Sequence, residues 1–510
     1  MQKYGIKALI LLLAGGLFPL SLAPLFLWPI GLVSLAALYY LITEAKTPGE
    51  SFKLSWWYAF GQFGSGVSWV YVSMSQFGGT SAPLSILMVA VFAAGLALIP
   101  AFWFWLMRYI VPRSQGANFH TSLVFAAFWL FSEWSRGWFL TGFPWLYAGD
   151  AHLDTWLSGW VPVLGSLGVS LICALIAALS MEALRQSQPF LLTVWLLWPA
   201  GMLLQNVDWT QPTGELTVSA VQGNIAQDIK WNPDMLNPTI QIYTEQTEQV
   251  WQSDLILWPE TAVPMIMTYF QPYLDSLNDL ATEQHSGLIT GIVFRHPTGT
   301  ELAGAYHNTL VAVGTAEGIY HKQKLVPFGE FVPFEKQLRG LIPFFDLEMS
   351  SFTSGQPQQP LLKITKESKQ YLLAPYICYE IAYPLLVADM AKDADMLITV
   401  SNDAWFGDSL GPKQHMALAR MRALETGRYL LRSTNTGITA LVDHRGHIIA
   451  QLPTGERGHL TGTAQMREGQ TPFMVFSVIP VLALSVLMLA YALIRQTQQR
   501  VSKEGSMTHG

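Results

Sequence analysis

The chain has 510 residues, of which 51% are hydrophobic and only 13% are charged, and its formal net charge is -6. Soluble globular proteins carry about 25% charged residues, so this composition excludes a wholly soluble protein and indicates a membrane protein, at least in part. The negative net charge argues against a nucleic-acid partner. The two cysteines, Cys173 and Cys378, lie far apart in the sequence, which excludes a disulfide framework and a cysteine-based metal site.

Apolar blocks fill most of the N-terminal part of the chain, and each is close to the ~20 residues that cross a bilayer. The predicted domains are a membrane domain over 1–207, a domain of soluble character over 208–472, a last span over 473–494 and a polar tail over 495–510. The eight expected spans cover residues 6–23, 25–43, 54–74, 84–107, 121–141, 160–181, 189–206 and 473–494.

The positions of lysine and arginine predict how the spans are oriented, because cytoplasmic loops are enriched in both. The alternate loops, 75–83 and 141–156, contain neither residue. We therefore expect both termini in the cytoplasm and the 208–472 domain on the other side. The basic residues that all fall on the cytoplasmic side are Lys3, Lys7, Lys46, Lys53, Arg108, Arg113, Arg185, Arg495, Arg500 and Lys503.

The fifth apolar block contains two charged residues, Glu133 and Arg136, three positions apart. This spacing lets the two side chains pair on one helical face. Charged residues at membrane depth are costly and often functional, so a functional pair is one interpretation. The alternative is that both residues lie near the outer interface, beside the aromatic loop 141–146.

Strands and helices alternate along the 208–472 domain, which predicts an α/β domain with functional residues at the strand ends. The expected strands cover 216–221, 255–258, 288–294, 309–313, 318–325, 371–377 and 396–400, the expected helices cover 237–252, 381–390 and 415–431, and a hairpin pairs 438–442 with 447–452.

Cys378 comes at the end of the apolar run 371–377 and directly before Tyr379 and Glu380. The following helix has Pro384 in its first turn, where the missing N–H of proline costs least. A cysteine at such an elbow presents its sulfur at the end of the sheet, and the helix N-terminus is expected to favour the thiolate. The alternative is a small buried core residue, as most free cysteines are.

Three strand ends together carry the groups that acyl transfer needs. Glu260 follows the strand 255–258, Lys322 lies in the basic run 318–325, and Cys378 ends its own strand. A carboxylate can take the proton of a thiol, and an ammonium can stabilise an oxyanion. Each residue alone has a simpler explanation, since Glu260 could cap a helix and Lys322 could be an exposed charge on a strand.

Lys322 and Lys324 lie two positions apart in the expected strand 318–325. On a strand both side chains are expected to point to the same face, so their geometry does not separate them.

Several motifs point together to one family. The motifs are Trp258-Pro-Glu-Thr-Ala262, Tyr320-His-Lys-Gln-Lys-Leu-Val-Pro-Phe-Gly-Glu330, Cys378-Tyr-Glu380, Ser401-Asn-Asp-Ala-Trp-Phe-Gly407, Gly64-Ser-Gly-Val-Ser-Trp-Val-Tyr-Val-Ser73, Thr141-Gly-Phe-Pro-Trp145 and Gln222-Gly-Asn224.

These motifs resemble the nitrilase, or carbon–nitrogen hydrolase, superfamily and, more narrowly, the apolipoprotein N-acyltransferase family. The resemblance implies a polytopic helical membrane bundle that carries a four-layer αββα domain. It also implies a triad of Glu260 as general base, Lys322 for the oxyanion and Cys378 as nucleophile. Where the superfamily usually has Lys-x-His-Leu, this chain has Lys322-Gln-Lys-Leu325, so Lys324 takes the histidine position and we choose Lys322 as the catalytic lysine.

The same resemblance implies ping-pong transfer of an acyl chain from a phospholipid to the α-amine of a diacylglyceryl-cysteine apolipoprotein. It implies a multi-pass protein of the bacterial inner membrane with its catalytic domain on the periplasmic side, acting as a monomer and without a metal or other cofactor. The remaining site residues are Glu330, Glu380 and Tyr379 as supports, and Trp231, Asn402 and Trp405 as substrate-binding residues.

Two other functions are considered. A membrane-anchored amidase or nitrilase would use the same triad with water as the acceptor, and it would release ammonia from a small amide without needing lipid. A lipid-binding membrane protein without enzymatic activity is the second alternative. Its sign would be the loss of a triad residue, and all three triad residues are present in this sequence.

Overall fold

The structure is a computed structural model that describes residues 2–111, 118–300, 302–333, 335–338, 340 and 351–507. Arg113 of the predicted basic loops lies outside these residues. The chain divides into two compact units. Unit 1 comprises Met1–Ser68, Ile86–Val207 and Phe476–Gly510, and unit 2 comprises Trp69–Ser85 and Asp208–Val475. The short stretch Trp69–Ser85, which the sequence places among the apolar blocks, thus packs with the α/β domain.

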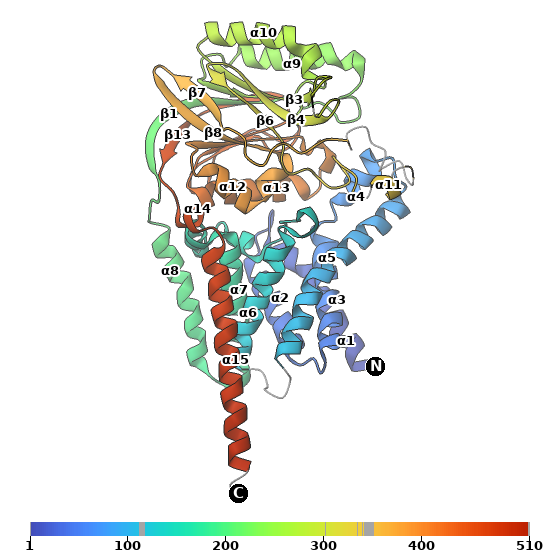
Figure 1. The fold of residues 1–510 in the computed structure, drawn as a ribbon, viewed down its shortest axis with the longest axis vertical. Coiled ribbons are helices and arrows are strands. Elements are labelled where there is room, and N and C mark those ends of the chain that lie inside the picture. Colours follow the sequence, from blue (N-terminus) through green and yellow to red (C-terminus); the bar gives the residue numbers. More distant parts are fainter. Residues whose placement is uncertain are drawn as a thin grey trace. The chain divides into compact units, whose positions relative to one another are not determined.

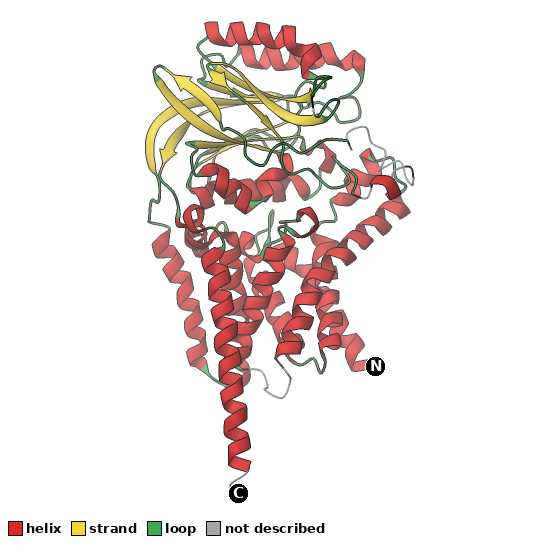
Figure 2. Cartoon of the chain, viewed as in Figure 1, coloured by secondary structure: helices red, strands yellow, loops and turns green. Residues whose placement is uncertain are grey.

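Unit 1 consists of helices (Figures 1 and 2). Several begin with the residues expected at a helix start, such as Thr47, whose hydroxyl accepts the Glu50 N–H, and Asn118, which accepts the Thr121 N–H. The longer helices are α1 (Gln2–Leu17), α2 (Trp28–Thr43), α3 (Pro48–Gly66), α5 (Ala82–Ile110, which starts in unit 2), α6 (Phe119–Arg136), α7 (Val161–Gln186), α8 (Leu197–Leu204) and α15 (Ile479–Met507).

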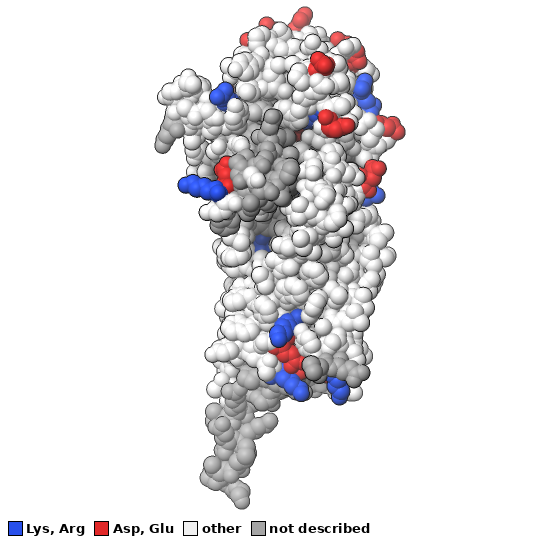
Figure 3. All heavy atoms as spheres, turned by 90° about the vertical axis from the view of Figure 1, so that its right-hand side faces the viewer, with Lys and Arg blue, Asp and Glu red and all other residues white. Residues whose placement is uncertain are grey.

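Many side chains of these helices are apolar and exposed, as expected for a surface that faces lipid. Among the described residues, three helical stretches are long and apolar enough to cross a membrane, namely Lys3–Ser21, Ala82–Ile110 and Trp156–Gln186. Shorter apolar helices cover Trp28–Thr43, Pro189–Leu204 and Ile479–Arg495. Figure 3 shows one face on which most of the helical surface lacks Lys, Arg, Asp and Glu, with charged side chains gathered at one end of the helices.

Glu133 and Arg136 are both buried in unit 1, at 1% and 2% exposure. The carboxylate of Glu133 accepts the Ala148 N–H at 2.8 Å, and the Arg136 guanidinium contacts the Leu146 carbonyl oxygen and lies over the ring of Tyr147. The two charged groups therefore anchor the aromatic loop that follows α6. A structural role explains them without a separate functional site.

Unit 2 is built around two β-sheets. Among the described residues, the first sheet has six strands in the order β13-β1-β2-β3-β4-β6, and the second has seven in the order β12-β11-β10-β9-β8-β7-β5. The strands are β1 (Gln211–Gln222), β2 (Leu255–Leu257), β3 (Gly287–Arg295), β4 (Tyr306–Gly314), β5 (Ala316–Glu317), β6 (Ile319–His321), β7 (Leu362–Lys366), β8 (Lys369–Ile377), β9 (Met396–Ser401), β10 (Leu430–Thr434), β11 (Ala440–Val442), β12 (Ile448–Gln451) and β13 (Gly458–Glu468).

The helices of unit 2 cover the outer faces of the two sheets (Figure 1). The pair α9 (Leu236–Glu248) and α10 (Met267–Glu283) packs on the first sheet, and α12 (Pro384–Ala391) and α13 (Gly411–Thr426) pack on the second. Short helices complete the unit at α4 (Val70–Val72), α11 (Glu335–Leu338) and α14 (Pro472–Phe476).

Three apolar layers hold these elements together. One lies between α9, α10 and the first sheet, the second between the two sheets, and the third between the second sheet and α12 and α13. Successive residues of β9 face different layers. Ile398 faces the layer between the two sheets, and Leu397 faces the layer beneath α12 and α13. The expected αββα sandwich is confirmed.

Two expected elements in this unit are present with different bounds. The helix predicted over 415–431 begins earlier, at Gly411, and ends at Thr426, because Gly427 adopts the left-handed conformation that closes a helix. The chain then enters β10. The strand predicted over 318–325 is only β6, and the chain leaves it after His321, so Lys322 and Lys324 are not strand residues that share a face.

Candidate active site

Cys378 occupies a strained turn at the end of β8. It begins the short 3₁₀-helix η10 (Cys378–Ala382), and its φ is 53°. Residues other than glycine rarely adopt this left-handed conformation, and those that do cluster at functional sites. The turn is sharp because α12 starts directly afterwards with Pro384 at its first position. The turn therefore presents a half-buried sulfur at the carboxyl end of β8, an interior strand of the second sheet.

Glu260 is held at the end of β2 by a close approach of two backbones. The N–H of Ala262 donates to the carbonyl oxygen of Gly291 in β3 at 3.0 Å. A side chain on Gly291 would place its Cβ 2.6 Å from the Pro259 oxygen and 2.8 Å from the Glu260 Cα. Only glycine fits there, so Gly291 sets the position of the Glu260 loop.

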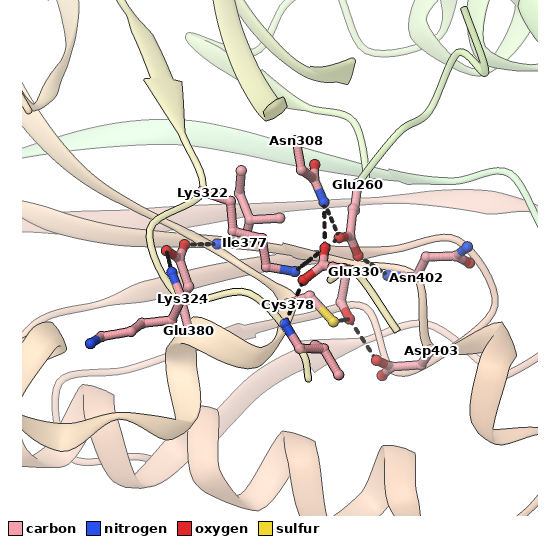
Figure 4. Close-up of polar contacts among 12 residues, drawn as sticks. Glu260, Asn308, Lys322, Lys324, Glu330, Ile377, Cys378, Glu380, Asn402 and Asp403 are labelled. Carbon is pink, nitrogen blue, oxygen red and sulfur yellow. Dashed lines mark hydrogen bonds and ion pairs between the residues drawn. The ribbon is translucent and has the colours of Figure 1, made fainter. Parts of the chain in front are cut away.

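Lys322 lies between two carboxylates (Figure 4). Its Nζ donates to Glu330 Oε1 at 2.7 Å and lies 3.5 Å from Glu260 Oε1. Asn308 Nδ2 donates to Glu260 Oε1 at 2.7 Å and to Glu330 Oε1 at 3.1 Å. Burial opposes the charge of Lys322, but Glu330 and Glu260 outweigh it and raise the pKa of the lysine. Within the described residues, no group of three or more His, Cys, Asp or Glu is arranged to hold a metal ion.

The surroundings of Cys378 favour the neutral form of its thiol. Burial raises its pKa, the charge of Glu260 raises it further, and Lys322 opposes both to a smaller extent. The helix expected to favour the thiolate starts only at Pro384, after the five-residue 3₁₀ turn that Cys378 begins, so Cys378 does not lie in the first turn of α12. A base has to remove the proton before the sulfur can attack, and Glu260 is close enough for its charge to raise the pKa of this thiol.

Lys324 is separated from this cluster. Its side chain is exposed, and its Nζ lies 5.5 Å from the centre of the Tyr383 ring. Figure 4 shows that this side chain extends away from the Cys378 sulfur, whereas Lys322 points towards Glu260 and Glu330. The geometry therefore separates the two lysines that the sequence could not.

Glu380 ties the elbow of Cys378 to the loop that carries Lys322. Its Oε1 accepts the N–H groups of Gln323 and Lys324 at 2.6 and 3.1 Å, and its Oε2 accepts the N–H of Ile377 at 2.8 Å. The hydroxyl of Tyr320 also donates to Oε1. Burial raises the pKa of Glu380 to about 7, although these N–H groups oppose the shift. Glu380 thus links two segments that are far apart in the sequence.

Two further residues, Asn402 and Lys230, form hydrogen bonds to Glu260. The backbone N–H of Asn402 donates to Glu260 Oε2 at 2.8 Å, while its side chain is taken up by Gln227 and Asn435. The ammonium of Lys230 is buried and donates to the backbone oxygen of Glu260 at 3.3 Å. Burial lowers the pKa of Lys230 to about 8. Both contacts fix the position of Glu260.

The structure places the predicted aromatic residues Tyr379, Trp231 and Trp405 in three different surroundings. Tyr379 is buried and packs edge-on against Tyr383, with ring centres 5.2 Å apart. Trp231 follows Lys230 and is 41% exposed. Trp405 packs edge-on against Phe77, and its backbone oxygen accepts the Ser73 hydroxyl at 2.8 Å. The stretch Trp69–Ser85 therefore holds the loop that contains Trp405.

Two parts of the chain match known families. Residues 14–179 match the apolipoprotein N-acyltransferase N-terminal domain, and residues 217–471 match the carbon–nitrogen hydrolase family. The chain is 44% identical to an apolipoprotein N-acyltransferase from Pseudomonas syringae pv. tomato, over 97% of each chain. The chain belongs to the apolipoprotein N-acyltransferase family. The family resemblance read from the sequence motifs is confirmed.

Other relatives in the apolipoprotein N-acyltransferase family are similar along nearly their whole length. A protein of that name from Pseudomonas aeruginosa PAO1 is 44% identical over 95% of each chain, and one from Shewanella oneidensis is 38% identical over 98% of each chain. A solved carbon–nitrogen hydrolase from Helicobacter pylori aligns with a TM-score of 0.36 at 17% identity, covering 49% of this chain and 88% of that one.

Some residues at the site of this family member were not predicted from the sequence. Asn308 is the clearest, because it bonds to both carboxylates of the cluster. It carries little signal in the sequence, because it lies between the polar residues His307 and Thr309 at the start of β4. The others are Gln227, Lys230, Ser401, Asp403, His415, Arg432 and Asn435.

Proposed function

We propose that this protein transfers a fatty acyl chain from a phospholipid to the N-terminal α-amine of a diacylglyceryl-cysteine apolipoprotein. Its membership of the apolipoprotein N-acyltransferase family and the names of its relatives support this activity. The observation that carries the mechanism is the buried cluster in which Lys322 bonds to Glu330 and Glu260, whose charge and that of Lys322 both act on the Cys378 thiol.

In the first half-reaction, Glu260 removes the proton of the Cys378 thiol, and the sulfur attacks an ester carbonyl carbon of the phospholipid. The ammonium of Lys322 stabilises the oxyanion that forms. The C–O bond then breaks, the lysophospholipid alcohol takes the proton from Glu260, and a thioester remains on Cys378.

In the second half-reaction, the free α-amine attacks the thioester carbon and loses its proton to Glu260. The C–S bond breaks, the amide leaves, and the thiolate recovers the proton. Glu330 keeps Lys322 in place, and Glu380 and Tyr379 keep the elbow in place. Trp231 and Trp405 form walls of the substrate site. Asn402 contributes through its backbone N–H, which holds Glu260, rather than by contacting the substrate. Neither half-reaction calls for a metal or an organic cofactor.

We also propose that unit 1 forms a multi-pass bundle in the bacterial inner membrane, with eight spans and the 208–472 domain on the periplasmic side. Two ion pairs support this orientation, because they join residues expected on the cytoplasmic side. Lys7 of α1 lies 3.1 Å from Glu44, which follows α2, and Arg185 near the end of α7 lies 3.8 Å from the same residue. An impermeant reagent should reach 208–472 only from the periplasm and the loop at Lys46 only from the cytoplasm, and labelling of both from one side would contradict this topology.

The test of the function compares two acceptors. Purified protein is given a phospholipid with a labelled acyl chain and a diacylglyceryl lipopeptide, either with a free α-amine or with that amine acetylated. The expected result is labelled amide on the free amine only. Release of labelled fatty acid at an equal rate with both peptides, or release of ammonia from a small amide without lipid, would favour the hydrolase alternative. Binding of the labelled lipid without any turnover would favour the non-enzymatic alternative.

A further inference from the structure

A second set of polar groups contacts Cys378 from the second sheet. The Oγ of Ser401, at the end of β9, lies 3.3 Å from the Cys378 sulfur and 2.6 Å from Asp403 Oδ1. A hydroxyl has one proton, so it can donate to only one of these two acceptors at a time. The Ser401 hydroxyl, which keeps its proton, donates mainly to the Asp403 carboxylate while the thiol is neutral, and it can turn to donate to the sulfur once the sulfur is charged.

His415 of α13 connects this group to the backbone of the cysteine. Its Nε2 lies 3.0 Å from the Cys378 carbonyl oxygen, and its Nδ1 lies 3.0 Å from Asp403 Oδ1. A carbonyl oxygen only accepts, so Nε2 carries a proton and donates it. This bond fixes the orientation of the peptide group that follows a residue with a φ of 53°.

Asp403 is the centre of this arrangement. Its Oδ2 accepts a hydrogen bond from Arg432 Nη2 at 2.7 Å, and both side chains are buried. Burial alone would raise the pKa of Asp403, but Arg432 and His415 outweigh it and hold the pKa of this carboxyl well below its usual range. Gly437 leaves the room for it, since a Cβ there would lie 2.7 Å from the Asp403 Cβ.

We propose that Ser401, Asp403 and His415 are positioning residues for Cys378: His415 holds the strained cysteine backbone, and Ser401 donates a hydrogen bond to the sulfur when it becomes a thiolate. Asp403 orients both and is itself held by Arg432. The proposal rests on Cys378 being the nucleophile of the proposed function. It adds to the Glu260–Lys322–Cys378 triad a hydrogen bond to the sulfur that becomes stronger when the sulfur is charged.

The test measures the reactivity of Cys378 without any lipid. In a Cys173→Ala background, iodoacetamide alkylates the remaining cysteine, and intact mass gives the rate at one fixed pH. Ser401→Ala should slow alkylation about tenfold, the size expected when a hydrogen bond to a charged atom is lost. Ser433→Ala is the matched control, because this buried serine of the neighbouring strand β10 donates only to the backbone oxygen of Val221. The control should alkylate at the parental rate.

A parental rate in Ser401→Ala, or an equal loss in Ser433→Ala, would overturn the proposal. The backbone contact is tested with His415→Gln, whose amide can still donate to the Cys378 oxygen, against His415→Ala. The glutamine variant should keep more of the kcat of acyl transfer than the alanine variant, with KM for phospholipid unchanged in both. Equal kcat in the two variants would remove His415 from the proposal. If alkylation follows the prediction but no lipopeptide is acylated, the proposed function fails and the positioning of the sulfur stands.

Discussion

The two sides of Cys378 carry similar groups in different arrangements. On the side of the first sheet, Lys322 lies between Glu260 and Glu330, and both carboxylates are 7% exposed. On the side of the second sheet, Asp403 lies between Arg432 and His415 and is 1% exposed. In the proposed mechanism Glu260 of the first set exchanges a proton with the sulfur, while Asp403 of the second set has no part in proton transfer. The comparison suggests that one side performs the chemistry and the other holds the nucleophile.

The largest effect is expected on the first side, from Lys322→Ala. The variant removes the fixed positive charge that opposes the developing oxyanion, and the rate of acyl transfer should fall about 100-fold or more. Lys322→Arg should restore little, because a planar guanidinium does not replace a compact ammonium between two carboxylates. The initial rate of transfer to a diacylglyceryl lipopeptide measures the effect.

Lys324→His is the matched control for this prediction. The residue is two positions away and exposed, and its ammonium lies over Tyr383 rather than near the sulfur. The variant should keep most of the activity. An inactive Lys324→His together with a substantially active Lys322→Ala would mean that the catalytic lysine has been assigned to the wrong residue.

A smaller loss, about 10- to 100-fold, is expected when Glu260 is displaced rather than removed. Gly291→Ala places a Cβ against the backbone of Pro259 and Glu260, and a shift of about 1 Å at a catalytic group costs up to about 100-fold in rate. Gly458→Ala is the control, since its Cβ would meet only Leu452 at 3.9 Å. Alkylation of Cys378 should also change in the Gly291 variant. Equal activity in the two alanine variants would show that the Glu260 loop tolerates displacement.

The sequence predicted the parts of this site that local pattern controls. Apolar runs gave the positions of most strands, and the polar residues after them gave Glu260 and Cys378. The end of β6 was not predictable, because the run 318–325 continues with residues that also suit a strand. What ends it is the pair of hydrogen bonds from Gln323 and Lys324 to Glu380, more than fifty residues later. Local pattern does not contain such a contact.

The positioning residues of the second side were hidden for the same reason. Ser401 and Asp403 belong to the motif over 401–407, but their partners His415 and Arg432 lie on α13 and β10. His415 on a mostly buried helix looks like an ordinary core residue. Its role depends on the carbonyl orientation of a cysteine with positive φ, which the sequence does not reveal.

The last effect is on stability rather than on rate and concerns Glu380, which holds the two sides together. Its pKa is about 7 in the folded protein, because burial raises it, against about 4.3 in an unfolded chain. Between these values the folded state binds more protons, so the free energy of unfolding falls as the pH rises from about 4.3 to 7, by roughly 3 kcal/mol at most. Glu380→Gln cannot ionise and should lose this dependence.

The thermal unfolding midpoint, measured across that pH range, checks this prediction. The wild-type midpoint should decline by a few degrees as the pH rises, and the Glu380→Gln midpoint should be lower at acidic pH but flatter. Glu317→Gln is the control, since this carboxylate is exposed in β5 and its replacement should leave the decline in place. A decline of the same size in Glu380→Gln would assign it to other groups.

The acyl-enzyme itself gives the most direct test of the account. Purified protein is incubated with phospholipid alone, and its intact mass is measured before and after addition of a lipopeptide with a free α-amine. Wild type and Cys173→Ala should each gain the mass of one acyl chain and lose it when the peptide is added, and Cys378→Ala should gain nothing. An acyl adduct that persists in Cys378→Ala, or peptide acylation by that variant, would contradict the central claim that Cys378 carries the acyl group.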